Sequence, residues 1–171
     1  CKANGPKPAV VLRGGKYSEF DAGASIPIWV KWPGKDVIGK TDAVTSQVEC
    51  LASVSALNEK RFHKNDAGDS HNQLDFLLGK SKIDRDYLVE KGYALSIIKG
   101  DWKYIEPNNG ARYNKYVDIE LGNDTISQLY NLKEDISEQN NLAISNPEKA
   151  EELAALLNEV KNNWWTLDPS L

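Results

Sequence analysis

One lysine near the start of the chain has the surroundings of a cation that binds an anion. Lys16 follows Gly14 and Gly15, so it lies on a turn with little steric restriction. An acidic residue, a second turn of small residues and an apolar run over residues 26–32 come next. Opposite unit charges about 4 Å apart attract by roughly 4 kcal/mol at an effective dielectric near 20. The alternative is an ordinary solvent-exposed loop lysine, and the residue type alone does not separate the two.

The elements around this turn are predicted to be a strand and a helix. Residues 26–32 are apolar without alternation, which is typical of a strand buried on both faces in a parallel sheet. Residues 45–57 predict a heavily packed helix with a capping box formed by Ser46 and Glu49. Cys50 lies in this pattern and is expected to be a small buried hydrophobe. The apolar face of the helix contains Val48, Leu51, Ala52, Val54 and Leu57.

A second group of elements follows the polar residues 58–69. A short helix around residues 74–78 should end at Gly79 in the left-handed conformation. Short strands are then predicted over residues 87–89, 94–98, 102–105, 116–119 and 129–132. Gly100 and Asp101 fit a two-residue type II′ hairpin turn, and this favours an antiparallel sheet.

The last helix has the clearest signals. Asn146 can cap it and Pro147 suits its first position, while the acids Glu148, Glu151 and Glu152 suit the positive end of its dipole. One apolar stripe consists of Leu153, Leu157, Val160 and Trp164. The stripe must dock to be stable, most simply across the antiparallel sheet.

The order of short motifs along the chain resembles that of the arylsulfatase family. In that family a Gly-(Gly/Cys)-Lys turn precedes small residues, an apolar strand and Trp-Pro-Gly. The matching stretches here are Gly15-Lys16, Asp21-Ala22-Gly23, Ile26-Pro27, Trp32-Pro33-Gly34, residues 42–48, 69–72, 77–80, 85–90, 99–105, 129–135 and 138–143. Each stretch is weak alone, but their shared order covers nearly the whole chain.

The resemblance implies an α+β chain that is part of an alkaline-phosphatase-like α/β sulfatase fold. Residues 1–80 would be the tail end of the catalytic α/β domain, with its last strand and helix. Residues 81–171 would be a C-terminal subdomain with a four-stranded antiparallel sheet and a packed terminal helix. Sulfatases hydrolyse sulfate esters with a formylglycine nucleophile and a calcium ion, and the lysine of the Gly-Gly-Lys turn contacts the sulfate. That role maps here onto Lys16, as a catalytic and substrate-binding residue.

The chain also departs from the family pattern. The Cys/Ser-x-Pro-x-Arg motif that yields formylglycine is absent, since neither Cys1 nor Cys50 is followed by such residues. No acidic cluster has the spacing of calcium ligands, and Ser25 stands where the family often has arginine. Because the chain begins at Cys1 and contains no methionine, we expect a C-terminal fragment that is inactive alone and needs an N-terminal catalytic domain as its partner.

Other candidate residues have simpler interpretations beside the functional one. His71 can meet the substrate, but a loop or helix-cap role explains it as well, and His63 reads as a solvated loop residue. Arg112 and Lys115 can contact a sulfated sugar or belong to the ordinary surface. Trp164 and Trp165 are side chains of a type that stacks on sugars, but the helical register of Trp164 favours a position in the core.

Composition narrows the function further. The 171 residues carry a formal net charge of −4, which argues against a nucleic-acid partner. No apolar run approaches the ~20 residues that span a bilayer. We therefore expect a periplasmic or secreted sulfatase acting on a sulfated small molecule or glycan, the location being what the family implies. The rival hypothesis is a non-catalytic glycan-binding or interaction module on a sulfatase-derived scaffold.

Overall fold

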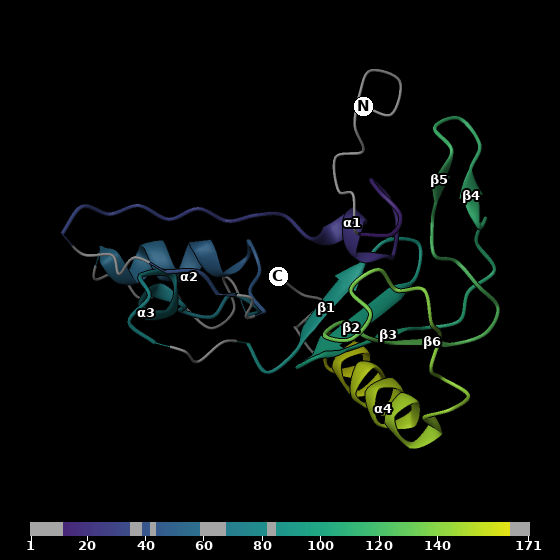
Figure 1. Cartoon of the computed structure of the whole chain (residues 1–171). Helices are drawn as coiled ribbons and strands as arrows, with labels where there is room; N and C mark the ends of the chain where they lie inside the picture. The colour runs from purple at the N-terminus through teal and green to yellow at the C-terminus, as the bar shows by residue number, and fades with distance from the viewer. Residues whose placement is uncertain (1–11, 35–38, 42–43, 59–67, 82–84, 165–171) are drawn as a thin grey trace, which may run out of the picture. The chain divides into compact units, whose positions relative to one another are not determined.

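The computed structural model describes residues 12–34, 39–41, 44–58, 68–81 and 85–164. The chain forms two compact units. The first, here called the sheet unit, combines residues 1–26 with residues 89–171, and the second, the helical unit, comprises residues 27–88 (Figure 1). The Lys16 segment therefore packs with the antiparallel sheet. The assignment of residues 1–80 to a catalytic domain and of 81–171 to a C-terminal subdomain stays a prediction.

The sheet unit is built on a four-stranded sheet, as predicted. Its strands are β1 (Leu88–Lys91), β2 (Leu95–Lys99), β3 (Trp102–Ile105) and β6 (Gln128–Asn131), in the order β1-β2-β3-β6. The pairs β2/β3 and β3/β6 are antiparallel. Lys99 pairs with Trp102 across the predicted two-residue turn, and Gly100 has a φ of +55°. The glycine is needed there because a side chain at that angle is strained.

Two different layers cover the faces of this sheet. Helix α4 (Pro147–Trp164) packs on β2 and β3. Its stripe is buried as predicted, with Leu153 and Leu157 at most 1% exposed, although the side chains of Trp164 and Trp165 lie outside the described residues. Phe20, which immediately precedes α1 (Asp21–Ala24), packs with Ala94, Ile105 and Tyr130. Figure 1 shows α4 and α1 on opposite sides of the sheet.

A small hairpin stands out from the sheet unit. Its strands are β4 (Tyr113–Asn114) and β5 (Ile119–Glu120), which pair antiparallel. The predicted strand over residues 116–119 is therefore wrong except at Ile119, because the chain reverses direction there. Asp118 adopts a φ of +49°, a left-handed conformation that aspartate tolerates better than most residues.

In the helical unit, α2 (Glu49–Leu57) begins later than predicted. The capping box is absent, because no side chain caps the helix and the Glu49 carboxylate instead accepts a 2.5 Å hydrogen bond from Arg85. The shorter α3 (Leu74–Leu77) matches the prediction better. Gly79 follows it with a φ of +72°, the expected left-handed stop.

The burial of α2 is the reverse of the prediction. Glu49 and Ser53 are at most 2% exposed, whereas Leu51 and Val54 are more than half exposed. Cys50, expected in the core, is also exposed. The reason is that the polar face finds partners within the unit; Gln73 N–H, for example, donates to the Ser53 hydroxyl. Among the described residues, none covers the apolar face.

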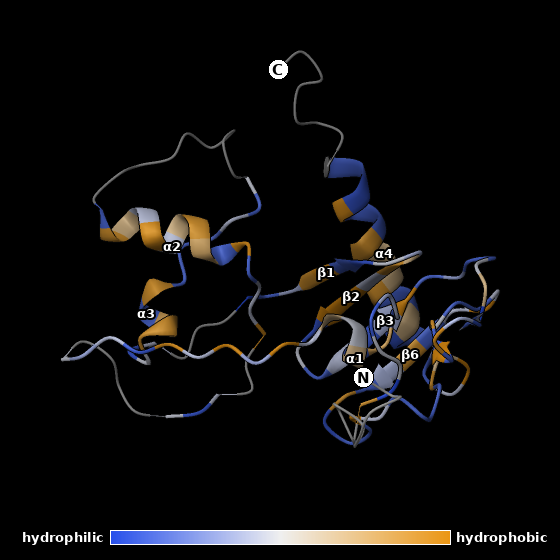
Figure 2. Cartoon of the chain, turned by 90° about the horizontal axis from the view of Figure 1, so that it is seen from above, coloured by the Kyte–Doolittle hydropathy of each residue, from blue (hydrophilic) through white to orange (hydrophobic). Residues whose placement is uncertain are grey.

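The strand predicted over residues 26–32 does not form either. These residues have no ladder partner among the described segments, and Trp29 is 91% exposed. A strand buried on both faces needs neighbours on both edges and both faces, and the described part of the chain supplies none. Figure 2 shows residues 27–32 of this segment and the apolar residues of α2, both in the helical unit. No helix in the described ranges is long and apolar enough to cross a membrane.

Candidate functional site

Lys16 lies at the second position of a tight turn. Ser18 N–H donates to the Gly15 carbonyl at 2.8 Å, which closes the turn around Lys16 and Tyr17. Tyr17 has a φ of +77°, a strained value for a bulky residue. A Cβ at Gly14 would lie 2.3 Å from the Ser18 hydroxyl, so only glycine fits there. The turn is therefore specified by its sequence, and it leaves the Lys16 side chain exposed.

Arg13 anchors the entrance to this turn. Its guanidinium donates to both carboxylate oxygens of Glu120, at 2.6 and 2.8 Å, and also donates to the Glu138 carbonyl. It lies 4.0 Å from the centre of the Phe20 ring, a cation–π distance. A paired guanidinium with a buried aromatic beneath it holds the backbone just before Gly14 in place.

Residues after the turn are fixed to the sheet unit by buried polar contacts. Glu19 is 3% exposed; its N–H donates to the Leu121 carbonyl, and its carboxylate accepts from Ala94 N–H, both at 2.8 Å. Burial raises the pKa of Glu19, and the backbone donors around it only partly oppose this. A Cβ at Gly92, which follows β1, would lie 2.3 Å from the Glu19 carboxylate, so a side chain there would displace that carboxylate.

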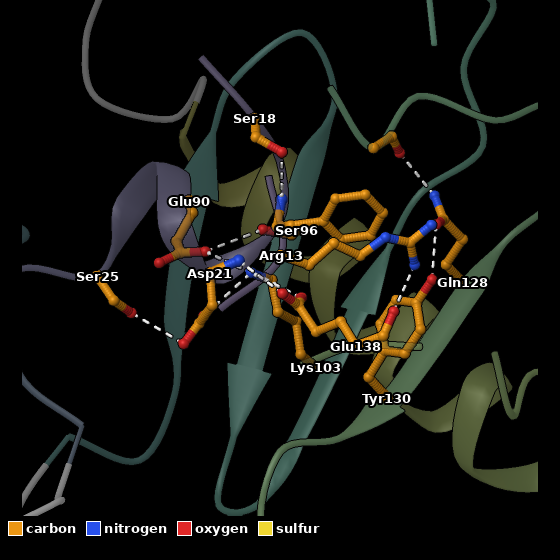
Figure 3. Close-up of polar contacts among 12 residues, drawn as sticks. Arg13, Ser18, Asp21, Ser25, Glu90, Ser96, Lys103, Gln128, Tyr130 and Glu138 are labelled. Atoms are coloured by element: carbon orange, nitrogen blue, oxygen red, sulfur yellow. Dashed lines mark hydrogen bonds and ion pairs between the residues drawn. The ribbon is translucent and has the colours of Figure 1, made fainter. Parts of the chain in front are cut away.

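A buried ion cluster follows at Asp21. Lys103 has no exposed surface, and its Nζ lies 3.3 Å from Asp21, 3.4 Å from Glu90 and 3.3 Å from Glu138 (Figure 3). Burial alone would lower the pKa of Lys103, but the three carboxylates raise it above its usual value. The lysine is therefore charged, and it ties β3, β1, the start of α1 and the loop after β6 together.

Glu138 is a carboxylate of this cluster with a strongly shifted pKa. Burial raises its pKa to about 7, although Lys103 and the Asp21 N–H stabilise its charged form. The carboxyl is thus protonated more readily in the folded chain than in the unfolded one, where its pKa is near 4.5. Its contribution to stability is complete below pH 4.5 and is lost as the pH rises through 7.

This shift predicts a measurable pH dependence. The free energy of unfolding of the unsubstituted protein, minus that of Glu138→Gln, should fall between pH 4.5 and 7, by roughly 1.4 kcal/mol per pH unit at the steepest. Above pH 8 the difference should be constant. Urea unfolding at several pH values measures it, and a difference that rises with pH would contradict the assigned pKa.

The residues singled out in the sequence lie in different environments in the structure. Lys16 is exposed on a fixed turn, and the Ser25 hydroxyl donates to Asp21 at 3.0 Å, at the end of α1. His71 is exposed in the helical unit, while Cys1 and His63 lie outside the described residues. A role of Lys16 or His71 in substrate binding stays a prediction.

Sequence reasoning missed Lys103 and Glu138. A signal for Lys103 existed, because a lysine two residues before Ile105 in a predicted strand must share its face. For Glu138 the sequence contains no such signal, since the residue lies in a polar loop and only the fold buries it. Its φ of +51° is unusual for glutamate.

The fold of the chain is similar to that of solved sulfatase structures. A structure from work on glycosaminoglycan metabolism by Bacteroides thetaiotaomicron matches 94% of this chain and 34% of its own, with 42% identity and a TM-score of 0.89. A sulfatase from Pseudoalteromonas matches 94% of this chain and 34% of its own at 17% identity and a TM-score of 0.74. The chain therefore has part of the alkaline-phosphatase-like sulfatase fold.

Sequence similarity agrees with the fold. The chain is 43% identical over 162 residues to an N-acetylgalactosamine-6-O-sulfatase of Bacteroides thetaiotaomicron, over 94% of this chain and 32% of that relative. No protein-family model matches. The resemblance to the C-terminal portion of an arylsulfatase-family protein is thus confirmed. The chain spans about a third of the length of these relatives.

Proposed function

We propose that this chain is part of an enzyme that hydrolyses sulfate esters, and that Lys16 contacts the sulfate. The observation that carries the proposal is the fixed turn, which presents an exposed ammonium in a chain closely similar to a sulfatase. In such a reaction a lysine neutralises negative charge on the sulfuryl oxygens as the ester bond breaks. Lys16 is not itself a nucleophile in this proposal.

The remaining chemistry would come from residues outside this chain. In the proposed enzyme a formylglycine supplies the nucleophile and a calcium ion binds the sulfate. Within the described segments no group of three His, Cys, Asp or Glu residues is arranged to hold a metal. The carboxylates of Asp21, Glu90 and Glu138 surround the Lys103 ammonium.

A larger catalytic domain is the proposed partner of the helical unit. Val48, Leu51 and Val54 of the α2 region are exposed and line a hollow of about 580 Å³. Ile28 and Trp29 are exposed as well, and the relatives are about three times as long as this chain. Contiguous exposed apolar surface favours burial against another domain. Exposed His71 belongs to the same unit and is a second candidate for substrate contact.

The proposed substrate is a sulfated carbohydrate, and the proposed location is the periplasm or the exterior of the cell. The matched relative is an N-acetylgalactosamine-6-O-sulfatase. In this chain the β4–β5 hairpin adjoins the Lys16 turn, because a Cβ at Gly15 would lie 3.2 Å from Ile119. The hairpin carries the exposed Tyr116 and Lys115. Tyrosine faces stack on sugar rings, and the lysine suits an anionic chain.

Substitution of the hairpin tyrosine tests the carbohydrate assignment. Tyr116→Ala should raise KM for a sulfated oligosaccharide by roughly three- to tenfold, because a stacking face is lost. KM for a small aryl sulfate should not change. Steady-state kinetics on the intact protein measure both, with Tyr93→Ala as the control, since Tyr93 is 70% exposed in the same unit but outside the hairpin. Equal effects on the two substrates would contradict the assignment.

The decisive experiment is an assay of the intact protein for inorganic sulfate released from an aryl sulfate and from a panel of sulfated saccharides, with and without calcium. Release of sulfate supports the enzyme. Binding of a sulfated glycan without hydrolysis, and without need of calcium, would instead support the alternative of a glycan-binding module. A Cys/Ser-x-Pro-x-Arg motif upstream of residue 1 would further favour the enzyme.

A further inference from the structure

We propose that Glu138 is a positioning residue that clamps the segment of residues 13–21 and thereby fixes Lys16. Its role in catalysis rests on the proposed sulfate-ester hydrolysis, but the clamp itself does not. Glu138 contacts both ends of the segment. Its backbone carbonyl accepts from the Arg13 guanidinium at the start, and its carboxylate accepts from Asp21 N–H, at 2.7 Å, at the end. Figure 3 shows both contacts meeting at this one residue.

These two contacts strengthen the closure of the loop that contains Lys16. Between them the chain makes the Gly15–Ser18 turn and then buries Ser18, Glu19 and Phe20. Lys16 is therefore exposed at the tip of a loop whose two ends are joined by Glu138 and by a 3.2 Å hydrogen bond from Ala22 N–H to the Arg13 carbonyl. An ammonium that acts in a transition state must be held in position by such supporting contacts, because small displacements are costly.

The loop that carries Glu138 is itself ordered. The carboxylate of Asp135 accepts from Gln139 N–H and Asn140 N–H, at 2.8 and 2.7 Å, and the Ser137 hydroxyl donates to it at 3.1 Å. This brings Glu138 into the buried interior with a left-handed φ of +51°. A strained, fully buried carboxylate is maintained only where its surroundings determine it strongly, and such residues cluster at functional sites.

The charged groups around Glu138 come from every neighbouring element. Lys103 of β3 faces its carboxylate directly, and Asp21 of α1 and Glu90 of β1 share that lysine. Arg13 contacts its backbone, and Tyr130 of β6 lies nearby: burial raises the pKa of Tyr130 to about 12, and the Glu138 charge adds to that rise while Arg13 opposes it. Other residues could hold Lys103 alone, since two carboxylates remain without Glu138. The ends of the segment are also joined directly, by the hydrogen bond from Ala22 N–H to the Arg13 carbonyl and by the contact of the Arg13 guanidinium with the Phe20 ring, so Glu138 reinforces a closure that the segment itself begins.

Limited proteolysis tests the clamp without an assay of sulfate release. Trypsin cuts after Lys16 only when the surrounding loop opens, so the rate of that cut reports local opening. In the intact protein, Glu138→Ala should raise the rate of cleavage after Lys16 about tenfold relative to cleavage after Lys149 in α4. Glu138→Gln, which keeps an acceptor for Asp21 N–H, should show a smaller increase.

Two control variants separate the clamp from general destabilisation. Glu134→Ala removes an exposed carboxylate from the same loop and should leave the ratio unchanged. Leu157→Ala opens a cavity under α4 and should raise both cleavage rates without raising their ratio in favour of Lys16. An unchanged ratio in Glu138→Ala, measured by mass spectrometry of the early fragments, would overturn the clamp.

Kinetics on the same variants test the positioning role. Measured where the variants are fully folded, kcat for sulfate release should fall about tenfold in Glu138→Ala and recover partly in Glu138→Gln, because a misplaced cation loses mainly transition-state stabilisation. Unchanged kcat with an opened loop would overturn the positioning role. An unsubstituted protein that releases no sulfate would instead refute the proposed function, and the cleavage ratio would still decide the clamp.

Discussion

Lys16→Ala should lower kcat for sulfate release from an aryl sulfate by about 10²–10³ in the intact enzyme, the usual cost of removing a positioned charge donor. The melting temperature should hardly change, because the Lys16 side chain is exposed, and surface substitutions of this kind shift stability by no more than about 0.5 kcal/mol. Steady-state kinetics and thermal unfolding of the purified variant provide the two measurements.

Two further variants make the Lys16 result specific. Lys16→Arg keeps the charge but replaces a compact ammonium by a planar guanidinium, so it should retain only part of the activity. Lys133→Ala removes another exposed lysine of the sheet unit, whose side chain is 75% exposed, and it should leave kcat unchanged. Unaltered turnover in Lys16→Ala would remove this residue from the mechanism and leave the fold relationship intact.

The elements that could be predicted are those whose patterns are local. The turn at Gly100, the strand from Trp102 and the stripe of Leu153 and Leu157 in α4 all follow from short-range spacing, and each finds its partner nearby. The strand over residues 26–32 and the packed face of α2 were predicted from apolar runs as well. They depend on neighbours that the described residues do not supply, so apolar side chains such as Trp29, Leu51 and Val54 are exposed.

The candidate site shows the same division. Lys16 was found from a motif, because a glycine-flanked turn is a local feature of sequence. Its supports were not, since Glu138 is brought together with Arg13 from 125 residues away and with Lys103 from a different element of the fold. From the sequence alone, charged residues are predicted to lie on the surface, and only the topology shows which of them lie in the interior. Lys16 was therefore predictable as a candidate anion-binding residue, whereas the contacts that hold its loop in place were not.

Lys103→Met should destabilise the sheet unit severely, by about 3–5 kcal/mol at pH 7.5, because it leaves one fully buried and two mostly buried carboxylates without their cation. The side chains are similar in length, so the loss comes from charge and not from packing. Urea unfolding measures it. Lys99→Met is the matched control on the neighbouring strand, since Lys99 is partly exposed and its Nζ lies 4.0 Å from Glu152; it should cost at most about 1 kcal/mol.

The acid response of the variant distinguishes this cause from a simple packing defect. Without Lys103 the remaining carboxylates must bind protons to stay buried, so their pKa values rise and the folded form is favoured as the pH falls. Lys103→Met should therefore recover part of its lost stability between pH 7.5 and 5. Adding Glu138→Gln should restore part of it at pH 7.5, because one of the uncompensated charges is gone. A variant as stable as the unsubstituted protein at pH 7.5, or one equally unstable at both pH values, would show that the buried lysine does not hold this cluster together through its charge.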